Sequence, residues 1–460
     1  MQNNVKPRQH FLESLKFRFG GVKKPSRSRE TGVLSHETSH PADEKSFEKI
    51  CFELACVDHC EVGSEKIAQM FELQELNIKM AVLSEGFRIV LPPYLDLPGL
   101  GDIEEQGVGG TCDQFIGSLP PSCRKVSEKA SPLGLVPKLL PHGLISKGAR
   151  YVGSCFWIWL CIVDDLTENL LGKEWDDCEA DLFLAFSKDV DESLFNDKDN
   201  QAVRVSLALR NVIHSTSICT GVVDSVKEAP WRQAFMDAVC EVLTGFREER
   251  PLLETNRIAM YEWMRVRAIT ISVRPFLILA RADLGLMPVI SHLGNPLDSG
   301  YLDVAATIDK ANMSNLRKVE CMLQLIMGLQ NDILGWEKDY KTENPLSAIQ
   351  ILIKCGSKPN IAVARVIDTH NELVRRCVQH AGTVCDDPNE HVRLLNGDSG
   401  THHTSKNFRP HVFGVFGHPR EAHPNRGTVP RENVRAYIQL ILGFANGMAK
   451  WMAVSKRYTS

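Results

Sequence analysis

The sequence predicts an all-α protein. Helical periodicity dominates the chain from Gly148 onward, with apolar residues recurring at the spacing of one helix face. No convincing set of alternating strands and no internal repeat stands out. The chain has 460 residues, of which 43% are hydrophobic, so it can bury a sizeable core. Packed helices around one core are therefore the expected architecture.

The charge, the length of the apolar runs and the cysteine content indicate which partners and which location to expect. The formal net charge is -4, so no basic surplus favours nucleic acid as a partner. The longest apolar run, Cys155 to Val163, is too short to cross a bilayer, and we expect no membrane span. The fourteen cysteines include no C-x-x-C pair, and the first residues lack the apolar core of a secretory signal. These features favour a reducing, cytoplasmic location.

The N-terminal part is polar and then ambiguous. Residues 1–45 are basic and rich in Ser, and we expect a disordered arm. Residues 46–87 show a helix-like but ambiguous pattern, which we interpret as a helical N-terminal extension. A stretch punctuated by Pro and Gly follows, and it reads as an irregular strap leading into one domain at 88–460.

The remaining helices follow in order along the chain. The periodicity predicts helices over 148–170, 178–187, 200–219, 230–249, 257–282, 312–340, 345–354, 360–380 and 431–455. Two segments interrupt them. Residues 285–311 carry a loop signal, and residues 383–430 are rich in Gly, Pro and His. The second segment is a long loop or an insertion retained by a faulty gene model, because so long a loop is unusual in a compact domain.

A first cluster of carboxylates ends an apolar, aromatic helix. The stretch "FWIWLCIVDDLTENL" places Asp164 and Glu168 one turn apart on one face, with Asp165 beside them. Clustered carboxylates repel one another and favour a hard cation such as Mg²⁺, which completes its shell with water and phosphate. A lone cluster of this kind is more often a helix end whose acids point into water, so a partner is needed.

The partner cluster lies in "MGLQNDILGWEKDYKTEN". Asn331, Gly335 and Asp339 are spaced four apart, so the three share one helix face. An amide oxygen and a carboxylate on one face can hold a second divalent cation. Lys338, next to Asp339, can reach an anion bound to that cation.

Together the two clusters resemble the class I terpene synthases of the single-domain microbial type. Their first mark is DDxx(D/E), matched by Asp164, Asp165 and Glu168. Their second is (N/D)Dxx(S/T/G)xxx(E/D), matched by Asn331, Asp332, Gly335 and Asp339. The C-terminal "WMAVSKRYTS" is similar to the family's Arg-Tyr pair, and "YEWMRVRAITISVRP" looks like the segment with the diphosphate-sensing arginine.

The resemblance implies a helical bundle with the active-site cavity at its centre. It further implies a linear prenyl diphosphate substrate, most simply farnesyl diphosphate, and Mg²⁺, three ions in number, some of them bound only with diphosphate. The metal ligands would be Asp164, Asp165, Glu168, Asn331, Gly335 and Asp339. Departure of the diphosphate would leave an allylic carbocation that cyclises to a sesquiterpene, as in a lyase of isoprenoid secondary metabolism.

Four residues are assigned to the diphosphate by the resemblance: Arg267, Lys338, Arg457 and Tyr458. Arg267 is the sensor by position, with a helix break expected at Thr270 and Ile271. Arg265 and Arg274 are rivals for this role, because Arg267 lies farther upstream of Asn331 than the family pattern suggests. Gly335 stands where Ser or Thr is more usual, so water must replace a hydroxyl ligand there.

An apolar throat would protect the carbocation from water. Trp157 and Leu160 continue the face of Asp164, and indole attracts cations more strongly than other aromatic rings. Trp157 is therefore a candidate to contact the substrate. Ordinary core packing is the competing interpretation for Trp157, and the favoured one for Phe156 and Trp159.

Two other functions remain open from the sequence. A trans-prenyltransferase would also be all-α and Mg²⁺-dependent, but it would carry a second DDxxD where this chain has Asn-Asp-x-x-Gly. A degenerate homologue could bind diphosphate and turn over poorly. The product, the choice among C10, C15 and C20 substrates, and the state as monomer or homodimer are not fixed by the sequence.

Overall fold

A computed structural model describes most of the chain. The described residues are 46–55, 73–93, 109–140, 145–286, 315–386 and 431–455, with short gaps at 131, 169, 171, 188–189, 191, 198, 219–224, 254 and 256–257. The predicted arm at 1–45 and most of the loops predicted at 285–311 and 383–430 lie outside these residues. Arg457 and Tyr458 also lie outside them.

The described fold is helical apart from one hairpin, which confirms the predicted class. The elements are α2 (Ser46–Leu54), β1 (Gln74–Met80), β2 (Glu85–Leu91), α4 (Gly109–Ser118), α5 (Pro121–Ala130), α6 (Pro132–Leu139), α7 (Lys147–Thr167), α8 (Gly172–Ala185), the 3₁₀ turn η2 (Glu192–Leu194), α9 (Gln201–Ser215), α10 (Ser225–Leu253), α11 (Met260–Thr270), α12 (Arg274–Asp283), α14 (Asn315–Leu334), α15 (Trp336–Lys341), α16 (Ala348–Lys354), α17 (Pro359–Asp386) and α19 (Arg431–Met452). Among the described residues, no helix is both long and apolar enough to span a membrane.

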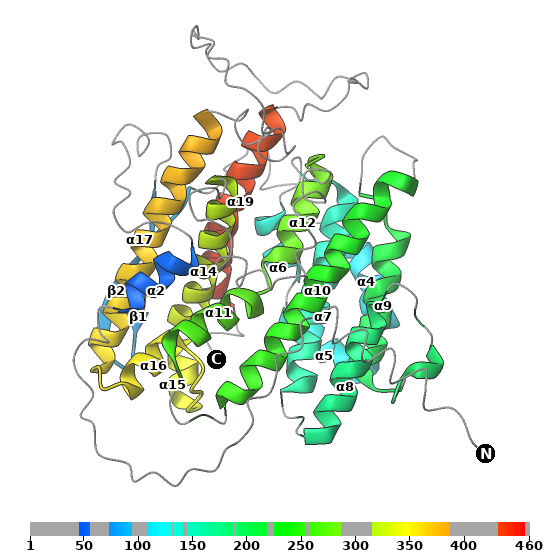
Figure 1. The fold of residues 1–460 in the computed structure, drawn as a ribbon, viewed down its shortest axis with the longest axis horizontal. Helices are drawn as coiled ribbons and strands as arrows, with labels where there is room; N and C mark the ends of the chain where they lie inside the picture. The colour runs from blue at the N-terminus through cyan, green and yellow to red at the C-terminus, as the bar shows by residue number, and fades with distance from the viewer. Residues whose placement is uncertain are drawn as a thin grey trace, which may run out of the picture.

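The helices form two groups that share a core. One group gathers around α7, which packs on α5, α6, α9 and α12, and the other pairs α14 with α17 and α19 (Figure 1). Helix α10 packs on α11, and α11 in turn packs on α14, so these two helices connect the groups. Helix α7 is buried on nearly all sides from Val152 to Val163, as an apolar helix at the centre of a bundle should be.

Several helices begin where local chemistry favours a start. The Ser146 hydroxyl accepts a hydrogen bond from the amide of Ala149 at 3.2 Å and caps α7. The Asp283 carboxylate accepts from the Ser146 amide at 2.9 Å, which fixes this end against α12. Pro121 and Pro132 stand at the first positions of α5 and α6, where a missing N–H costs nothing.

One buried ion pair joins α12, α14 and α19. The Arg281 guanidinium donates from Nε to Glu320 Oε1 at 2.8 Å, and the Tyr437 hydroxyl donates to the same oxygen. The guanidinium also lies 5.4 Å from the centre of the Tyr437 ring. All three side chains are buried, so their charges and hydroxyl are matched inside the core rather than in water.

The structure corrects the sequence analysis in three places. Residues 74–80 and 85–91 form an antiparallel hairpin, so among the described residues of 46–87 the helical interpretation holds only for α2. Helices α4, α5 and α6 were not predicted. The helix expected at 312–340 is broken at Gly335, and the helical segment expected at 257–282 is divided at Ile271–Val273, beside the break that the resemblance implied at Thr270 and Ile271.

The break after α11 lies where the resemblance placed it. Ser272 has φ 60°, a left-handed conformation that ends a helix, and its amide donates to the Ile269 carbonyl at 3.0 Å. The Ser272 hydroxyl donates to the Thr270 carbonyl at 2.9 Å. These two bonds turn the chain out of α11, and α12 starts at Arg274.

Candidate functional site

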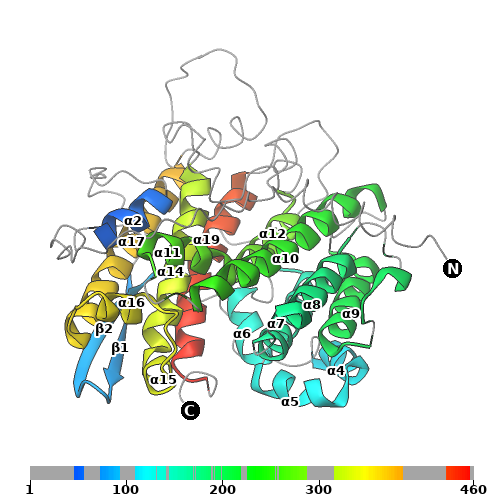
Figure 2. The same ribbon diagram turned by 60° about the horizontal axis from the view of Figure 1, so that its bottom comes forward.

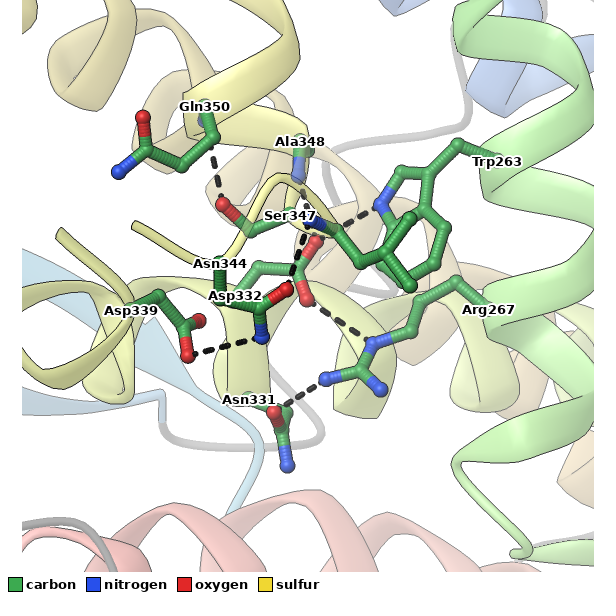
Figure 3. Close-up of polar contacts among 10 residues, drawn as sticks. Trp263, Arg267, Asn331, Asp332, Asp339, Asn344, Ser347, Ala348 and Gln350 are labelled. Atoms are coloured by element: carbon green, nitrogen blue, oxygen red, sulfur yellow. Dashed lines mark hydrogen bonds and ion pairs between the residues drawn. The ribbon is translucent and has the colours of Figure 1, made fainter. Parts of the chain in front are cut away.

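Arg267 lies at the centre of the second predicted cluster. From α11 its Nε contacts Asp332 Oδ1 on α14 at 2.9 Å, and its terminal nitrogen donates to the side-chain oxygen of Asn331 (Figure 3). The guanidinium lies 5.5 Å from the ring centre of Trp263. Gly328 makes this approach possible, because a Cβ there would lie 3.1 Å from Arg267 Cγ. The predicted sensor and the predicted metal motif are thus adjacent.

Asp332 anchors the cluster rather than facing a ligand. Its side chain is 1% exposed, and Oδ2 accepts from the Trp263 indole at 3.1 Å and from the Ala348 amide at 2.8 Å (Figure 3). Burial raises the pKa of Asp332, and Arg267 and the two donors oppose that rise. A carboxylate with both oxygens engaged in this way holds Arg267, α11 and the start of α16 together.

Asn331 and Asp339 stay aligned across the kink at Gly335. The Gly335 amide donates to the Asn331 carbonyl at 2.8 Å, and the Asp339 amide donates to the Gly335 carbonyl at 3.0 Å. The helical spacing therefore continues from α14 into α15. Asn344 steadies the far end, since its side-chain nitrogen donates to Asp339 Oδ1 at 3.3 Å.

Asp339 sits in surroundings that favour a cation. Burial, together with the charge of Asp332, raises its pKa to about 6, and Arg267, Asn344 and Lys338 act in the opposite direction. Lys338 is exposed beside it. A carboxyl group whose ionisation is opposed by burial and by a second carboxylate would be stabilised by a divalent ion.

The first cluster stands at the C-terminal end of α7. Asp164, Asp165 and Glu168 are exposed, and they directly follow the buried run that ends at Val163. The Glu168 amide still donates to the Asp164 carbonyl at 3.0 Å, so the three side chains remain on the last helical turn.

Arg250 of α10 holds this end of α7. Its guanidinium donates to the carbonyls of Thr167 and Leu170 and lies 3.7 Å from the ring centre of Trp175 on α8. A cation at the C-terminal carbonyls of a helix complements the helix dipole. Arg250 therefore fixes the turn from which the three acidic side chains project.

Glu249, the neighbour of Arg250, connects the two clusters. Burial, together with the charges of Asp164 and Asp332, raises its pKa to about 7, and the charges of Arg267 and Arg250 oppose this rise. Asp164 belongs to the first cluster, and Asp332 and Arg267 belong to the second. The side chain of Glu249 is thus near enough to both to interact with their charges, which sequence reasoning did not predict.

The rival sensor arginines point elsewhere. Arg265 pairs with Glu248 of α10 at 2.7 Å, and Arg274 pairs with Glu241 of the same helix. Both hold α10 against the segment around the helix break. Of the three arginines, Arg267 is the one that the structure places on the second cluster.

The aromatic residues of α7 divide into two kinds. The ring of Phe156 stacks on that of Trp159, with centres 5.7 Å apart, and the Trp159 indole donates to Ser206 Oγ at 2.8 Å, as core residues do. Trp157 is also buried, and its indole donates to the Ala130 carbonyl at 2.7 Å. The ring of Trp157 meets that of Trp451 on α19 edge to face, with centres 5.3 Å apart, so it lies where α7 meets the second group of helices.

Both clusters contain oxygen donors suited to Mg²⁺, but among the described residues these donors are not gathered into one site, and the Asn331 oxygen is already hydrogen-bonded. Within the described part of the chain, no group of three or more His, Cys, Asp and Glu side chains is gathered to hold a metal ion. The oxygen of Asn331 accepts from Arg267, so ligation there would require that bond to be shared or broken. Such a site fits Mg²⁺, which is usually held by one or two carboxylates and completed by substrate phosphate and water.

Sequence analysis did not identify three residues that interact with the side chains of the two clusters. Trp263 and Asn344 lie within the quoted stretches but outside the motif positions, and Glu249 lies outside both stretches, so none of the three was assigned a role. The Trp at 263, four residues before Arg267, shares its helix face, and this spacing is the one signal in the sequence that could have found it.

Comparisons with known proteins point to the same family and the same helical fold. Residues 155–376 match the family described as terpene synthase family 2, C-terminal metal binding. Microbial Terpene synthase-like protein 1 of Selaginella moellendorffii is 24% identical over 270 residues, which are 57% of this chain and 70% of that protein. Among solved structures, a-eudesmol synthase superimposes with a TM-score of 0.51 at 12% identity, and a variant of cucumene synthase with 0.50 at 15%. Each alignment covers 76% of this chain and 96% of the other.

Proposed function

We propose that this chain is a Mg²⁺-dependent cyclase of the class I terpene synthase type, which the match of residues 155–376 to the metal-binding family and the likeness of its fold to terpene synthases support. Its substrate would be a linear prenyl diphosphate, most simply farnesyl diphosphate. The reaction breaks the bond between C1 and the diphosphate oxygen, the diphosphate leaves with the electron pair, and the carbocation closes to a sesquiterpene as it loses a proton. This proposal makes the protein a lyase of isoprenoid metabolism.

The metal would be held from both clusters. Asp164, Asp165 and Glu168 supply carboxylates from α7, and Asn331 and Asp339 supply an amide oxygen and a carboxylate from α14 and α15. At Gly335, which lacks a side chain, water would take the place of a hydroxyl ligand. Bound Mg²⁺ supplies Lewis-acid stabilisation of the leaving diphosphate.

Basic side chains would bind the diphosphate oxygens. Arg267 has three polar neighbours in Asp332, Asn331 and the Trp263 ring, so its guanidinium is already oriented toward the second cluster. Lys338 is exposed next to Asp339 and can reach the same anion. Arg457 and Tyr458 would add donors from the C-terminal segment. Hydrogen bonds from charged donors to phosphate oxygens are stronger than neutral ones.

The wall of α7 below the acidic turn would contact the prenyl chain. Leu160 and Trp157 lie one and two turns before Asp164 on its own face, and both are at most 8% exposed. Because the indole N–H of Trp157 is satisfied by Ala130, the ring can offer its apolar surface and its π electrons without an unpaired donor. Exclusion of water there would keep the carbocation from being captured as an alcohol.

The observation that carries the proposal is the charge environment of Glu249. Its carboxyl group interacts with Asp164 from one motif and with Asp332 and Arg267 from the other. These interactions support a shared region near α10 and α11 for two motifs that are about 170 residues apart in sequence. Mg²⁺ and a diphosphate require such a shared region.

The test is turnover of C10, C15 and C20 prenyl diphosphates by the purified protein with Mg²⁺, with the organic extract read by mass spectrometry. We expect a volatile terpene from at least one substrate, abolished by EDTA, by Asp165→Asn or by Asn331→Ala. Asp177→Asn, which changes an exposed acid on α8, is the matched control and should keep its activity. Full turnover in Asp165→Asn and Asn331→Ala would contradict the ligand assignment.

The alternatives are separated by the same assay. Chain elongation after addition of isopentenyl diphosphate would identify a trans-prenyltransferase. Binding of diphosphate without release of any organic product would identify a degenerate homologue, an outcome favoured by the engagement of Asn331 with Arg267 and by the missing hydroxyl at Gly335.

A further inference from the structure

The two edges of the hairpin differ. Asn371 of α17 closes the edge of β2, because its side-chain oxygen accepts from the Val90 amide at 2.7 Å and its nitrogen donates to the Arg88 carbonyl at 3.2 Å. An amide side chain here replaces the main chain of a third strand. The exposed edge of a strand invites pairing with another chain, and on β2 this opportunity is removed.

The edge of β1 is open. In an antiparallel ladder, residues alternate between those that bond across the pair and those whose N–H and C=O point away. Arg88 and Val90 point away from β1, so their partners Asn77 and Glu75 point away from β2, and Lys79 does the same two residues on. Among the described residues, no hydrogen bond reaches these outward main-chain groups.

The surroundings of β1 leave room for a partner. The side chains of Glu75, Asn77 and Lys79 are exposed. Asn77, Ile78 and Lys79 line, with residues 84–88, a hollow of about 500 Å³. Figure 2 shows the hairpin projecting beyond the helices at the edge of the molecule.

The outward residues of β1 are complementary to themselves, although Glu75 also pairs with Arg88 of its own hairpin at 3.1 Å and would share its charge between the two cations. A second β1 laid antiparallel with Asn77 opposite Asn77 brings Glu75 opposite Lys79 of the other copy, twice by symmetry. Those three positions are the ones with outward main-chain groups, so each pair can exchange two hydrogen bonds. Register, hydrogen bonding and charge thus agree in a single alignment.

We propose that this protein forms a two-fold symmetric dimer through antiparallel pairing of β1 with β1 of a second copy. The pairing would join two hairpins into one four-stranded sheet. On the opposite face, Leu76 comes opposite Ile78 of the other copy, and both are half-buried against the core of their own chain. Such an isologous contact is the commonest form of homodimer. A contact made by one short strand is small, so the dimer should be reversible.

Charged residues on an edge strand commonly prevent pairing rather than promote it. The two possibilities differ in a measurable way. If the charges only repel other strands, the protein stays monomeric at every concentration. If they select a second copy, sedimentation velocity should show a concentration-dependent shift from monomer to dimer, and monomer throughout would overturn the proposal.

Single charge reversals test the register. Glu75→Lys places Lys opposite Lys79, and Lys79→Glu places Glu opposite Glu75, so each variant alone should dimerise about tenfold more weakly than the natural protein. Mixing the two variants restores opposite charges at both positions, and the mixture should dimerise again. Equal dimerisation of a single variant, or a mixture that stays monomeric, would rule the register out.

Two more variants separate pairing from folding. Asn77→Pro removes an N–H that points away from β2, so it should abolish the dimer while the thermal melting of the monomer changes little. Glu85→Lys makes the same charge change as Glu75→Lys on the other strand of the hairpin and should leave the dimer intact. Loss of the dimer in Glu85→Lys and Glu75→Lys alike would attribute the effect to net charge and refute the strand pairing.

Discussion

At the scale of single residues, Arg267 combines a structural and a functional role. It neutralises the buried Asp332 and also reaches Asn331, so the group proposed to bind diphosphate is part of the frame of the site. Its side chain is 13% exposed, and that of Asp332 only 1%. An ion pair so deeply placed depends on both partners, because neither charge can be solvated alone.

Replacing Arg267 by Gln should lower both stability and turnover. The loss of the cation leaves Asp332 charged and buried, which costs about 3–5 kcal/mol of unfolding free energy. Arg265→Gln is the control, since its pair with Glu248 is partly exposed and is worth about 1 kcal/mol or less. Urea denaturation and steady-state kinetics would measure both effects. Equal losses in the two variants would contradict the assignment of Arg267 over Arg265.

The residues of the motifs could be predicted because helical spacing alone brings them together. Asp164 with Glu168, and Asn331 with Asp339, need only a period of 3.6 residues to share a face. Trp263, Asn344 and Glu249 could not be predicted, because their role depends on how α10, α11 and α15 pack on one another. Tertiary packing of this kind leaves no local pattern in the sequence.

At the scale of elements, the end of α7 depends on α10. Arg250 binds the carbonyls of Thr167 and Leu170 and stacks on Trp175, so one side chain holds the last turn of the helix that carries three acids. The neighbouring Arg247 pairs with Glu179 of α8 at 3.3 Å and lies 5.6 Å from the ring centre of Phe183. Both arginines therefore contact α8, and Arg250 in addition holds the end of α7.

Arg250→Ala should weaken the use of Mg²⁺. Freed from the guanidinium, the last turn of α7 loses the cation that complements its dipole, and the carboxylates become less well positioned. We expect the Mg²⁺ concentration for half-maximal activity to rise about tenfold, with partial rescue by Arg250→Lys, which restores charge without the planar stacking. Titration with Mg²⁺ at fixed substrate measures this. Arg247→Ala is the control, and an identical shift in that variant would show that the effect is general loss of packing.

Local features of the sequence explain why the analysis missed helices α5 and α6 and strand β1. Pro121 and Pro132 each occupy the first position of a helix, where proline is favoured, whereas proline inside a helix would break it. In "QELNIKM" the alternation of β1 is real, but its outward residues are charged or polar and its inward ones few. A two-stranded hairpin is marginal alone, and α17 stabilises it by packing on β2, the partner strand of β1.

At the scale of the whole molecule, Glu249 lies where the two groups of helices face each other. Its proximity to Asp164 and to Asp332 concentrates negative charge there, and its raised pKa is the result. A glutamate carboxyl group ordinarily has a pKa of 4.5, whereas the pKa of Glu249 is raised to about 7 in the folded protein. Its contribution to stability is therefore full below about pH 4.5 and is lost as the pH rises through 7.

Glu249→Gln should consequently be stabilising at high pH. The amide keeps the shape of the protonated side chain and cannot ionise, so in EDTA its melting temperature should exceed that of the natural protein at pH 8 and match it at pH 5. The difference corresponds to about 1–3 kcal/mol. Parallel melting profiles for the two proteins across this range would show that Glu249 ionises normally. Scanning calorimetry at several pH values gives the answer.

The oxygen shared by Arg281 and Tyr437 constrains how this sequence can change over evolution. Because Glu320 Oε1 serves helices α12, α14 and α19 together, a substitution at Arg281 or Glu320 leaves a buried charge unpaired, and one at Tyr437 removes a donor from the shared oxygen. Neutral drift at these sites must therefore proceed by compensated changes, and descendants should differ there in concert or not at all.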